Sequence, residues 1–298
     1  SRVSWFQICV PSGNCGRGML SYQHEYHCGN HADVLKHSIL ALTIRALQRK
    51  DKPLRIIDAH AGSGIYELGS PEAQRNAEFR TGISRVLSAV SPPLELEPYL
   101  AVVRAVNPDG GGLSRYPGSP QIAHHLLRPQ DHLELLELHP QAVARLRRIF
   151  GRDARIHIHD RDSYEGLPGL VPPPERRGLV LIDPAYEVRQ ELAAVLDTLS
   201  AGHARWPGGT WLIWYPLLRD PQTSRLPAKL AASGIRRIFR TELQVESAGY
   251  MGLRGSGLLI INPPYGLDTA LANLLPWLWE HLANESRGGW IAEWLVGE

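Results

Sequence analysis

Two short segments of this chain have residue types suited to holding an amino group beside an aromatic ring. Residues 183–186 read DPAY and residues 262–265 read NPPY, and each follows a short apolar run. The acid or amide oxygen of such a segment can accept hydrogen bonds from an N–H group, and a carboxylate can also take up a proton. The tyrosine can stack on a planar ring. The position of each segment in the fold decides which one can meet a substrate.

The DPAY segment is one residue away from DPPY, which adenine-N6 methyltransferases place on their target base. The exocyclic amine of adenine attacks poorly because its lone pair is delocalised into the ring. Hydrogen bonds from its N–H groups to Asp183 and to the Pro184 carbonyl would localise that pair, and Asp183 could accept the released proton. Tyr186 would stack on a base flipped out of its helix. Ala185 keeps its backbone carbonyl, so we expect it to cost only the φ restriction of a proline, about 0.4–1 kcal/mol.

The elements that position these segments are predicted by hydrophobic periodicity. Apolar runs alternating with helical stretches indicate an α/β protein with a largely parallel sheet. The predicted strands lie within 54–64, 132–140, 154–162, 178–186, 209–216, 235–245 and 256–265. Ligands of such sheets bind beyond the carboxyl ends of the parallel strands. Asp183 closes the fourth strand, which we expect beside the first. Asn262 closes what we predict to be the last strand, running antiparallel, so NPPY should lie at the opposite edge as a strand exit.

Polar residues also follow the first three predicted strands. The turn DAHAGSG at 58–64 lets the backbone approach a ligand, but it lacks the third glycine of a dinucleotide-binding turn. Glu137 could accept hydrogen bonds from both hydroxyls of a ribose, and Asp162 with Ser163 suits the exocyclic amine of an adenine. Each carboxylate alone is more often a helix cap. The ordered series, however, is typical of S-adenosylmethionine-dependent methyltransferases.

The composition is that of an ordinary globular protein, with 43% hydrophobic and 21% charged residues among 298. No apolar run approaches the ~20 residues needed to cross a bilayer, and the start lacks a signal-peptide pattern. Three cysteines near the start form no disulfide framework, so we expect a cytoplasmic protein without membrane contact. The net charge of +2 makes no case for nucleic acid. Basic clusters at 145–161 and 219–240 could contact a phosphate backbone or simply be solvated.

The chain divides into four predicted parts. Residues 1–18 lack periodicity and are expected to be a peripheral extension. Residues 19–64 hold a polar segment, an amphipathic helix over 31–49 and the first strand. Residues 65–130 have helical patterns around 73–89 and 94–106, which indicates a helical insertion. Residues 131–298 complete the main domain.

Histidines and a cysteine gather near the start of the second part, at His24, His27, Cys28, His31 and His37. They could suggest zinc, but the sequence has no C-x₂-C pair and no second ligand cluster. We therefore predict no metal. We expect this polar, aromatic segment to fold over the site and to handle substrate.

From Met19 to Glu298 the sequence resembles the RlmJ family, bacterial methyltransferases that modify adenine N6 in 23S ribosomal RNA. The resemblance implies a Rossmann-like class I fold, with S-adenosylmethionine as cofactor and a small helical subdomain inserted after the first strand. We expect a monomer with 23S rRNA as its partner. The motifs that carry the resemblance are MLSYQHEYHCGNHADVLKH (19–37), DAHAGSGIYELGS (58–70), YPGSP (116–120), ELHP (137–140), RRGLVLIDPAYE (176–187), WYP (214–216), SGIRRI (233–238), SGLLIINPP (256–264) and LPWL (275–278).

The resemblance also implies roles for individual residues. Asp183 would be the catalytic proton acceptor, with Pro184 and Tyr186 beside it. Where relatives have Asp-Gly after the third strand, this chain has Ser163, which could restrict a left-handed backbone or move the adenine pocket slightly. Contacts with the target nucleotide would involve Tyr22, His24 and Lys36. Cofactor contacts would fall on His37, His60, Gly62, Ser119, Glu137, Asp162, Ser163 and Asp183.

Two alternatives remain open at this point. Within the enzyme class, the DPPY-like pattern also serves DNA adenine and glutamine-amide methyltransferases, although no sequence-reading helix stands out. From a different class, the chain could be a catalytically inactive RNA-binding protein. The joint presence of Asp183, Tyr186, Glu137 and His60 disfavours this second alternative.

Overall fold

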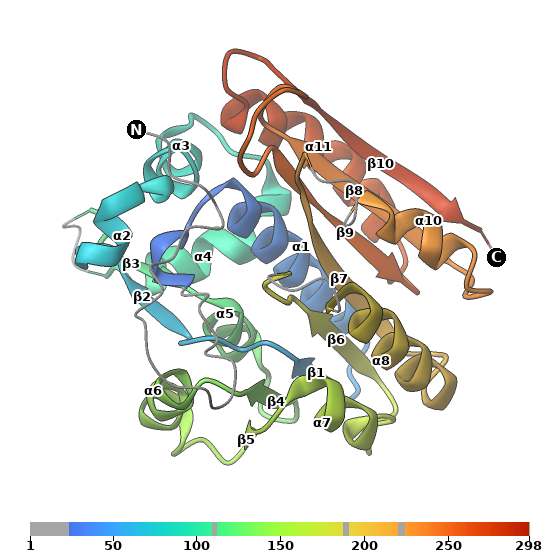
Figure 1. Ribbon diagram of the computed structural model, residues 1–298. Coiled ribbons are helices and arrows are strands. Elements are labelled where there is room, and N and C mark those ends of the chain that lie inside the picture. Colours follow the sequence, from blue (N-terminus) through green and yellow to red (C-terminus); the bar gives the residue numbers. More distant parts are fainter. Residues whose placement is uncertain (1–23, 109–111, 187–190, 220–223, 298) are drawn as a thin grey trace, which may run out of the picture.

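A mixed eight-stranded sheet forms the centre of the computed structural model, which describes residues 24–108, 112–186, 191–219 and 224–297 (Figure 1). The strand order is β10-β8-β9-β7-β6-β1-β4-β5. Each run predicted as a strand overlaps one of these strands, so the predicted α/β, Rossmann-like fold is confirmed. The strands are β1 (Arg55–Asp58), β4 (His132–Glu137), β5 (Ile156–Asp160), β6 (Gly178–Ile182), β7 (Thr210–Leu217), β8 (Ile238–Gln244), β9 (Gly255–Ile261) and β10 (Gly289–Val296).

The sheet is parallel on one side and antiparallel on the other. Strands β5, β4, β1, β6 and β7 pair in parallel. Strand β9 runs antiparallel between β7 and β8, which confirms the predicted direction of the strand before NPPY. The prediction that this strand is the last one is wrong, because β10 follows it and pairs with β8. As an edge strand, β10 leaves Trp290 and Trp294 partly exposed, and Glu293 interrupts its apolar residues, so it has no continuous apolar run.

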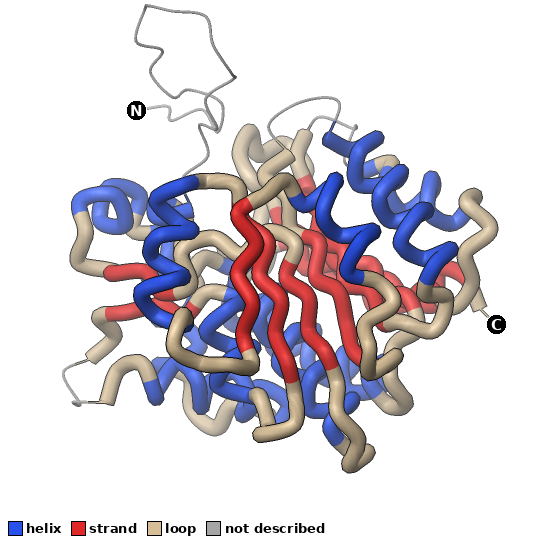
Figure 2. Tube along the Cα trace, turned by 90° about the horizontal axis from the view of Figure 1, so that it is seen from below, coloured by secondary structure: helices blue, strands red, loops and turns tan. Residues whose placement is uncertain are grey.

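Helices cover both faces of this sheet (Figure 2). Ile56 of β1 packs among the helices of one face, and the adjacent Ile57 packs among those of the other. One face holds α1 (His31–Gln48), α5 (Ser119–Leu126), α6 (Pro140–Phe150) and α11 (Leu267–Leu282), and the other holds α7 (Ser163–Leu170), α8 (Glu191–Arg205) and α10 (Leu226–Ala231). Among the described helices, none is long and apolar enough to span a membrane. Because the crossover helices change face between β1 and β6, the crevice at the carboxyl ends of these two strands is the expected ligand site.

The chain between β1 and β4 forms a mainly helical insertion, drawn at the left of Figure 1. The predicted helix at 73–89 is broken at Ala77, which adopts a φ of 49°, and at Gly82, whose ψ of -110° is not helical. Helix α5 packs on β1 and β4 and therefore serves as their crossover helix. The preceding elements are β2 (Ile65–Glu67), α2 (Pro71–Asn76), η2 (Glu78–Arg80), α3 (Ile83–Ser88), η3 (Leu94–Leu96), α4 (Glu97–Ala105) and β3 (Arg115–Pro117), of which β2 and β3 pair antiparallel.

Helix α1 matches the helix predicted over 31–49 and begins at an Asn30 cap, whose side chain accepts the Asp33 N–H at 2.9 Å. An amphipathic surface helix would turn its polar side to solvent. Here Asp33, Lys36 and His37 are at most 5% exposed. The polar side of α1 therefore faces the interior, toward the carboxyl ends of β1 and β6.

Candidate active site

Lys36 of α1 lies against Asp183, the residue that directly follows β6. Its Nζ is 2.5 Å from Asp183 Oδ2 and 3.0 Å from Asp33 Oδ1. Burial would lower the pKa of Lys36, but the two carboxylates raise this pKa above its usual range. The side chain is therefore an ammonium held between two acids. Because β6 pairs with β1, this ion pair lies at the predicted crevice.

His60, in the loop after β1, connects Asp183 to the loop after β5. The Asp183 backbone N–H donates to His60 Nδ1 at 3.2 Å, so Nε2 carries the proton and donates to Ser163 Oγ at 3.0 Å. Burial lowers the pKa of His60 to about 4, which keeps the ring neutral. Ser163 begins helix α7 and is not among the residues with positive φ. The expected restriction of a left-handed backbone at Ser163 is therefore wrong.

Glu137 closes β4 and fixes the loop after β1. Its Oε2 accepts the Gly62 N–H at 2.7 Å, and Oε1 accepts the Leu138 and His139 N–H groups at 2.8 and 2.7 Å. Gly62 has a φ of 63°, which favours glycine at this position. Asp162, in contrast, accepts the Tyr164 N–H at 2.7 Å and caps α7. This is the helix-cap role that a carboxylate at a strand end more often has. Contacts of these residues with a cofactor remain predictions.

Asp58 at the end of β1 is a candidate that the sequence reasoning missed. Its side chain is 1% exposed, and Oδ1 accepts the His60 N–H at 3.2 Å. Its Oδ2 is buried without a hydrogen-bond partner among the described residues. Burial raises the pKa of Asp58 to about 7, although the neighbouring Ser119 hydroxyl favours the charged form. The available signal was an acid closing the first strand, immediately before a glycine-rich turn.

His37 lies deeper than the other predicted cofactor residues. It is 1% exposed, and its Nδ1 is 2.8 Å from the Tyr116 hydroxyl, which in turn lies 2.9 Å from the Tyr99 hydroxyl. Burial lowers the pKa of His37 to about 3, so its ring is neutral. In this conformation the ring binds protein groups, and its contact with a cofactor remains a prediction.

Tyr186 of the DPAY segment is turned into the protein. It is 8% exposed, its hydroxyl donates to the Trp214 carbonyl at 2.8 Å, and its φ is 53°. Pro184 is also buried, whereas Ala185 is exposed. Stacking of Tyr186 on a base remains a prediction, and it requires the ring to leave this position.

Comparison with known proteins agrees with this arrangement. A family model described as "Ribosomal RNA large subunit methyltransferase D, RlmJ" matches residues 51–296. The chain belongs to the RlmJ family. Its resemblance to that family, inferred from motifs, is thereby confirmed, and the chain is a methyltransferase.

Individual relatives match along most of the chain. Proteins named "Ribosomal RNA large subunit methyltransferase J" are 43% identical in Escherichia coli K12 and 40% in Haemophilus influenzae Rd. Each alignment covers 94% of this chain and 100% of the relative. A crystal structure of a Legionella pneumophila protein is 32% identical, with a TM-score of 0.82, over 89% of this chain and 97% of that one. The sequence relatives and the similar crystal structure therefore both match nearly the whole chain.

The segment around His24, which the RlmJ resemblance predicts to contact substrate, lies over the loop after β1. His24 Nε2 is 2.8 Å from Asp33 Oδ2, and Glu25 Oε1 accepts hydrogen bonds from Arg145 and from Ser63 at 2.6 and 3.3 Å. Tyr22 lies outside the described residues. No group of three or more His, Cys, Asp or Glu side chains arranged to hold a metal occurs within the described part of the chain.

The NPPY segment lies away from this site, as predicted. Ile261 at the end of β9 pairs with Trp211 near the start of β7, so the segment is at the opposite edge of the sheet from Asp183. Asn262 Nδ2 donates to the Pro207 and Gly209 carbonyls at 2.7 and 2.9 Å. The asparagine therefore has a structural role as the anchor of a strand exit.

Proposed function

We propose that the chain methylates N6 of an adenosine in 23S rRNA with S-adenosylmethionine as methyl donor. The observation that carries this proposal is the position of Asp183 at the carboxyl end of β6, beside β1. There it is tied to His60 and, through that ring, to Ser163. The named relatives act on large-subunit ribosomal RNA, which supports this substrate class.

The residues around the crevice fit S-adenosylmethionine, which supplies an electrophilic methyl group on a sulfonium. The buried Oδ2 of Asp58, which has no partner within the part of the chain that the structure describes, suits the ammonium of the methionine part, since that contact would compensate its burial. Glu137 Oε2 accepts one N–H group and can also accept a ribose hydroxyl. Ser163 and Asp162 would lie at the adenine, and Gly62 brings the backbone close. Ser119 and His37 would also contact the cofactor.

Asp183 would accept a hydrogen bond from the target amine and then its proton. Its Oδ2 already accepts from Lys36, so the amine would use the other oxygen or displace the ammonium. The Pro184 carbonyl would take the second N–H of the amine. Tyr186 would open from Trp214 to stack on the base, with Tyr22, His24 and Lys36 near the target nucleotide.

Methylation of deproteinised 23S rRNA with labelled cofactor tests this function. The wild-type protein should produce N6-methyladenosine, detected by mass spectrometry of digested nucleosides. Asp183→Ala and the isosteric Asp183→Asn should each lose at least about 100-fold in rate, because the acceptor of the amine is gone. Equal labelling by these variants refutes the role of Asp183.

A thermal shift assay separates the enzyme from an inactive RNA-binding protein. Saturating S-adenosylmethionine should raise the Tm, because a ligand that binds only the folded state stabilises it. An unchanged Tm would refute the cofactor site. Duplex DNA and a glutamine-containing peptide serve as alternative methyl acceptors, and labelling of either one instead of RNA would overturn the substrate class.

A further inference from the structure

Asp33 lies one helical turn before Lys36 and is not among the residues that the RlmJ resemblance implied. We infer that Asp33 is a positioning residue that supplies the counter-charge of Lys36 while Asp183 takes up the proton of the substrate amine. The inference rests on the proposed function, because it concerns the same proton transfer. It assigns a task to a buried acid that sits one contact away from the reacting groups.

The geometry places Asp33 at the centre of a buried polar cluster. Its Oδ1 lies 3.0 Å from Lys36 Nζ and 4.0 Å from His37 Nε2. Its Oδ2 lies 2.8 Å from His24 Nε2 and accepts the Gly29 N–H at 2.9 Å. The side chain is 1% exposed. Burial would raise the pKa of Asp33, but His24 and Lys36 hold it well below its usual range, so this acid is a carboxylate.

The proposed reaction changes the charge of only one of the two acids that hold Lys36. A bond forms between adenine N6 and the methyl carbon while the carbon–sulfur bond breaks, and sulfur keeps the electron pair. N6 then gives one proton to Asp183, whose carboxylate becomes a neutral carboxylic acid. At that moment the ammonium of Lys36 loses the charge of its partner at 2.5 Å.

A buried cation without a counter-ion is unfavourable, because the protein does not replace the water that solvated it. Asp33 remains charged and within contact, so the ammonium stays paired throughout the transfer. Asp33 also offers Lys36 a position away from Asp183 Oδ2 when the substrate amine needs that oxygen. The Trp214 ring, whose centre lies 5.8 Å from Lys36 Nζ, borders this position.

A purely structural role is the competing explanation, since Asp33 also fixes the Gly29 N–H and the His24 ring. The two roles differ in their dependence on Lys36. A counter-ion has no task once the ammonium is removed, whereas the contacts with Gly29 and His24 persist. A double-mutant cycle between Asp33 and Lys36 therefore separates them.

The experiment uses the full chain as Asp33→Asn, Lys36→Met and the double variant, assayed on 23S rRNA with labelled S-adenosylmethionine. Asp33→Asn should lower kcat at least about tenfold, with KM for RNA and cofactor within about twofold. In the Lys36→Met background, the same change should alter kcat by less than about twofold. An unchanged kcat in Asp33→Asn overturns the inference, and so does an equal loss in both backgrounds.

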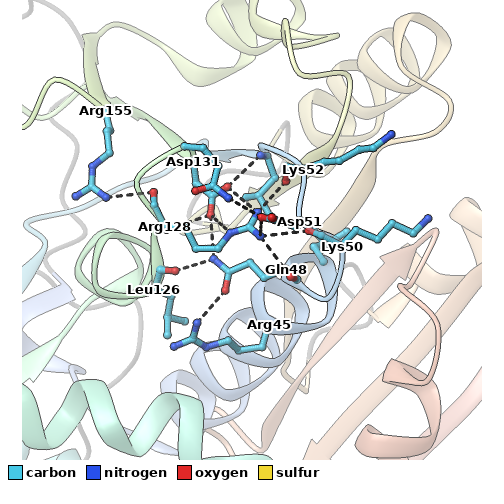
Figure 3. Close-up of polar contacts among 12 residues, drawn as sticks. Arg45, Gln48, Lys50, Asp51, Lys52, Leu126, Arg128, Asp131 and Arg155 are labelled. Carbon is cyan, nitrogen blue, oxygen red and sulfur yellow. Dashed lines mark hydrogen bonds and ion pairs between the residues drawn. The ribbon is translucent and has the colours of Figure 1, made fainter.

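Asp131 provides a matched control (Figure 3). It is also a buried acid, 0% exposed, and pairs with Arg128 three positions before it. It precedes β4 and binds the N–H of Leu54 before β1, so it lies at the edge of the sheet opposite the site. Asp131→Asn should therefore leave kcat within about twofold of wild type at a temperature where the variant is folded.

Unfolding in urea of the wild-type protein, Asp33→Asn, Lys36→Met and the double variant gives a readout that needs no substrate. The ion pair predicts that Asp33→Asn and Lys36→Met are non-additive in the free energy of unfolding. Additive effects would overturn the inference whatever the activities are. If the wild-type protein labels no RNA, the proposed function fails. The unfolding cycle then still decides whether Asp33 is the counter-ion of Lys36.

Discussion

Asp58 is a buried carboxyl group whose charged form makes the free protein less stable. Its pKa is raised to about 7 by burial, against an ordinary value of 3.8, so the folded protein binds more protons than the unfolded chain between these values. Its contribution to stability is therefore greatest below pH 4 and is lost as the pH rises through about 7. A bound ammonium group would reverse this loss by pairing with the charged form.

Asp58→Asn should therefore make the free protein more stable at pH 8 while weakening cofactor binding. The shift of about three pKa units sets an upper limit of about 4 kcal/mol on the gain. Affinity for S-adenosylmethionine should fall at least about tenfold, measured by calorimetry. Asp131→Asn should instead make the free protein less stable. Hydrogen bonds with Arg128 and other groups lower the pKa of Asp131 more than burial raises it, so the charged side chain stabilises the folded state. A less stable Asp58→Asn protein at pH 8 would contradict the assigned effect of burial.

Helix α1 and the DPAY loop illustrate the element scale. The periodicity of 31–49 predicted a helix, but it did not reveal that the polar side of that helix faces the site. In the loop, Tyr186 has a left-handed backbone conformation, and its hydroxyl donates to the Trp214 carbonyl. This hydrogen bond fixes the C-terminal end of the DPAY segment. The exposed Ala185 lies between this anchor and the buried Pro184.

Ala185→Pro should leave methylation activity equal or improved. A proline at this position reduces the freedom of the unfolded chain, which corresponds to about 0.4–1 kcal/mol when its φ is compatible. Initial rates on 23S rRNA and the midpoint of urea unfolding check both effects. A loss of activity beyond about tenfold would mean that the loop requires a φ that proline cannot adopt.

At the scale of the whole molecule, exposed arginines lie on the β5 side of the site. Arg148 of α6 and Arg161 after β5 are exposed, and no ion pair is observed for either one within the described residues. Arg145 and Arg147, on the same helix, pair with Glu25 and Asp160. Arg161 directly follows β5 and therefore presents positive charge at the carboxyl end of that strand, while Arg148 lies on the helix that packs beside β5.

Charge reversal tests whether this surface contacts RNA. Arg148→Glu with Arg161→Glu should weaken binding of 23S rRNA fragments and make it less sensitive to salt, because fewer counterions are released. Lys50→Glu is the control, since Lys50 is exposed beyond the end of α1 at the opposite edge of the sheet (Figure 3). Fluorescence anisotropy at several salt concentrations measures both slopes. Equal losses of RNA affinity in the arginine variant and in Lys50→Glu would indicate nonspecific attraction only.

The sequence by itself predicted seven of the eight strands of the main sheet, because local periodicity marks them, and it predicted from the usual order of the fold that DPAY rather than NPPY lies at the carboxyl ends of the parallel strands. β10 was not predicted, because an edge strand does not need a continuous apolar run. Only the tertiary structure decided the environment of the polar groups. Asp183 meets Lys36 across 147 positions of sequence, and Asp58 acquires a buried oxygen that has no hydrogen-bond partner among the described residues. Burial and ion pairing depend on what packs around a group, and no local pattern of residues encodes that.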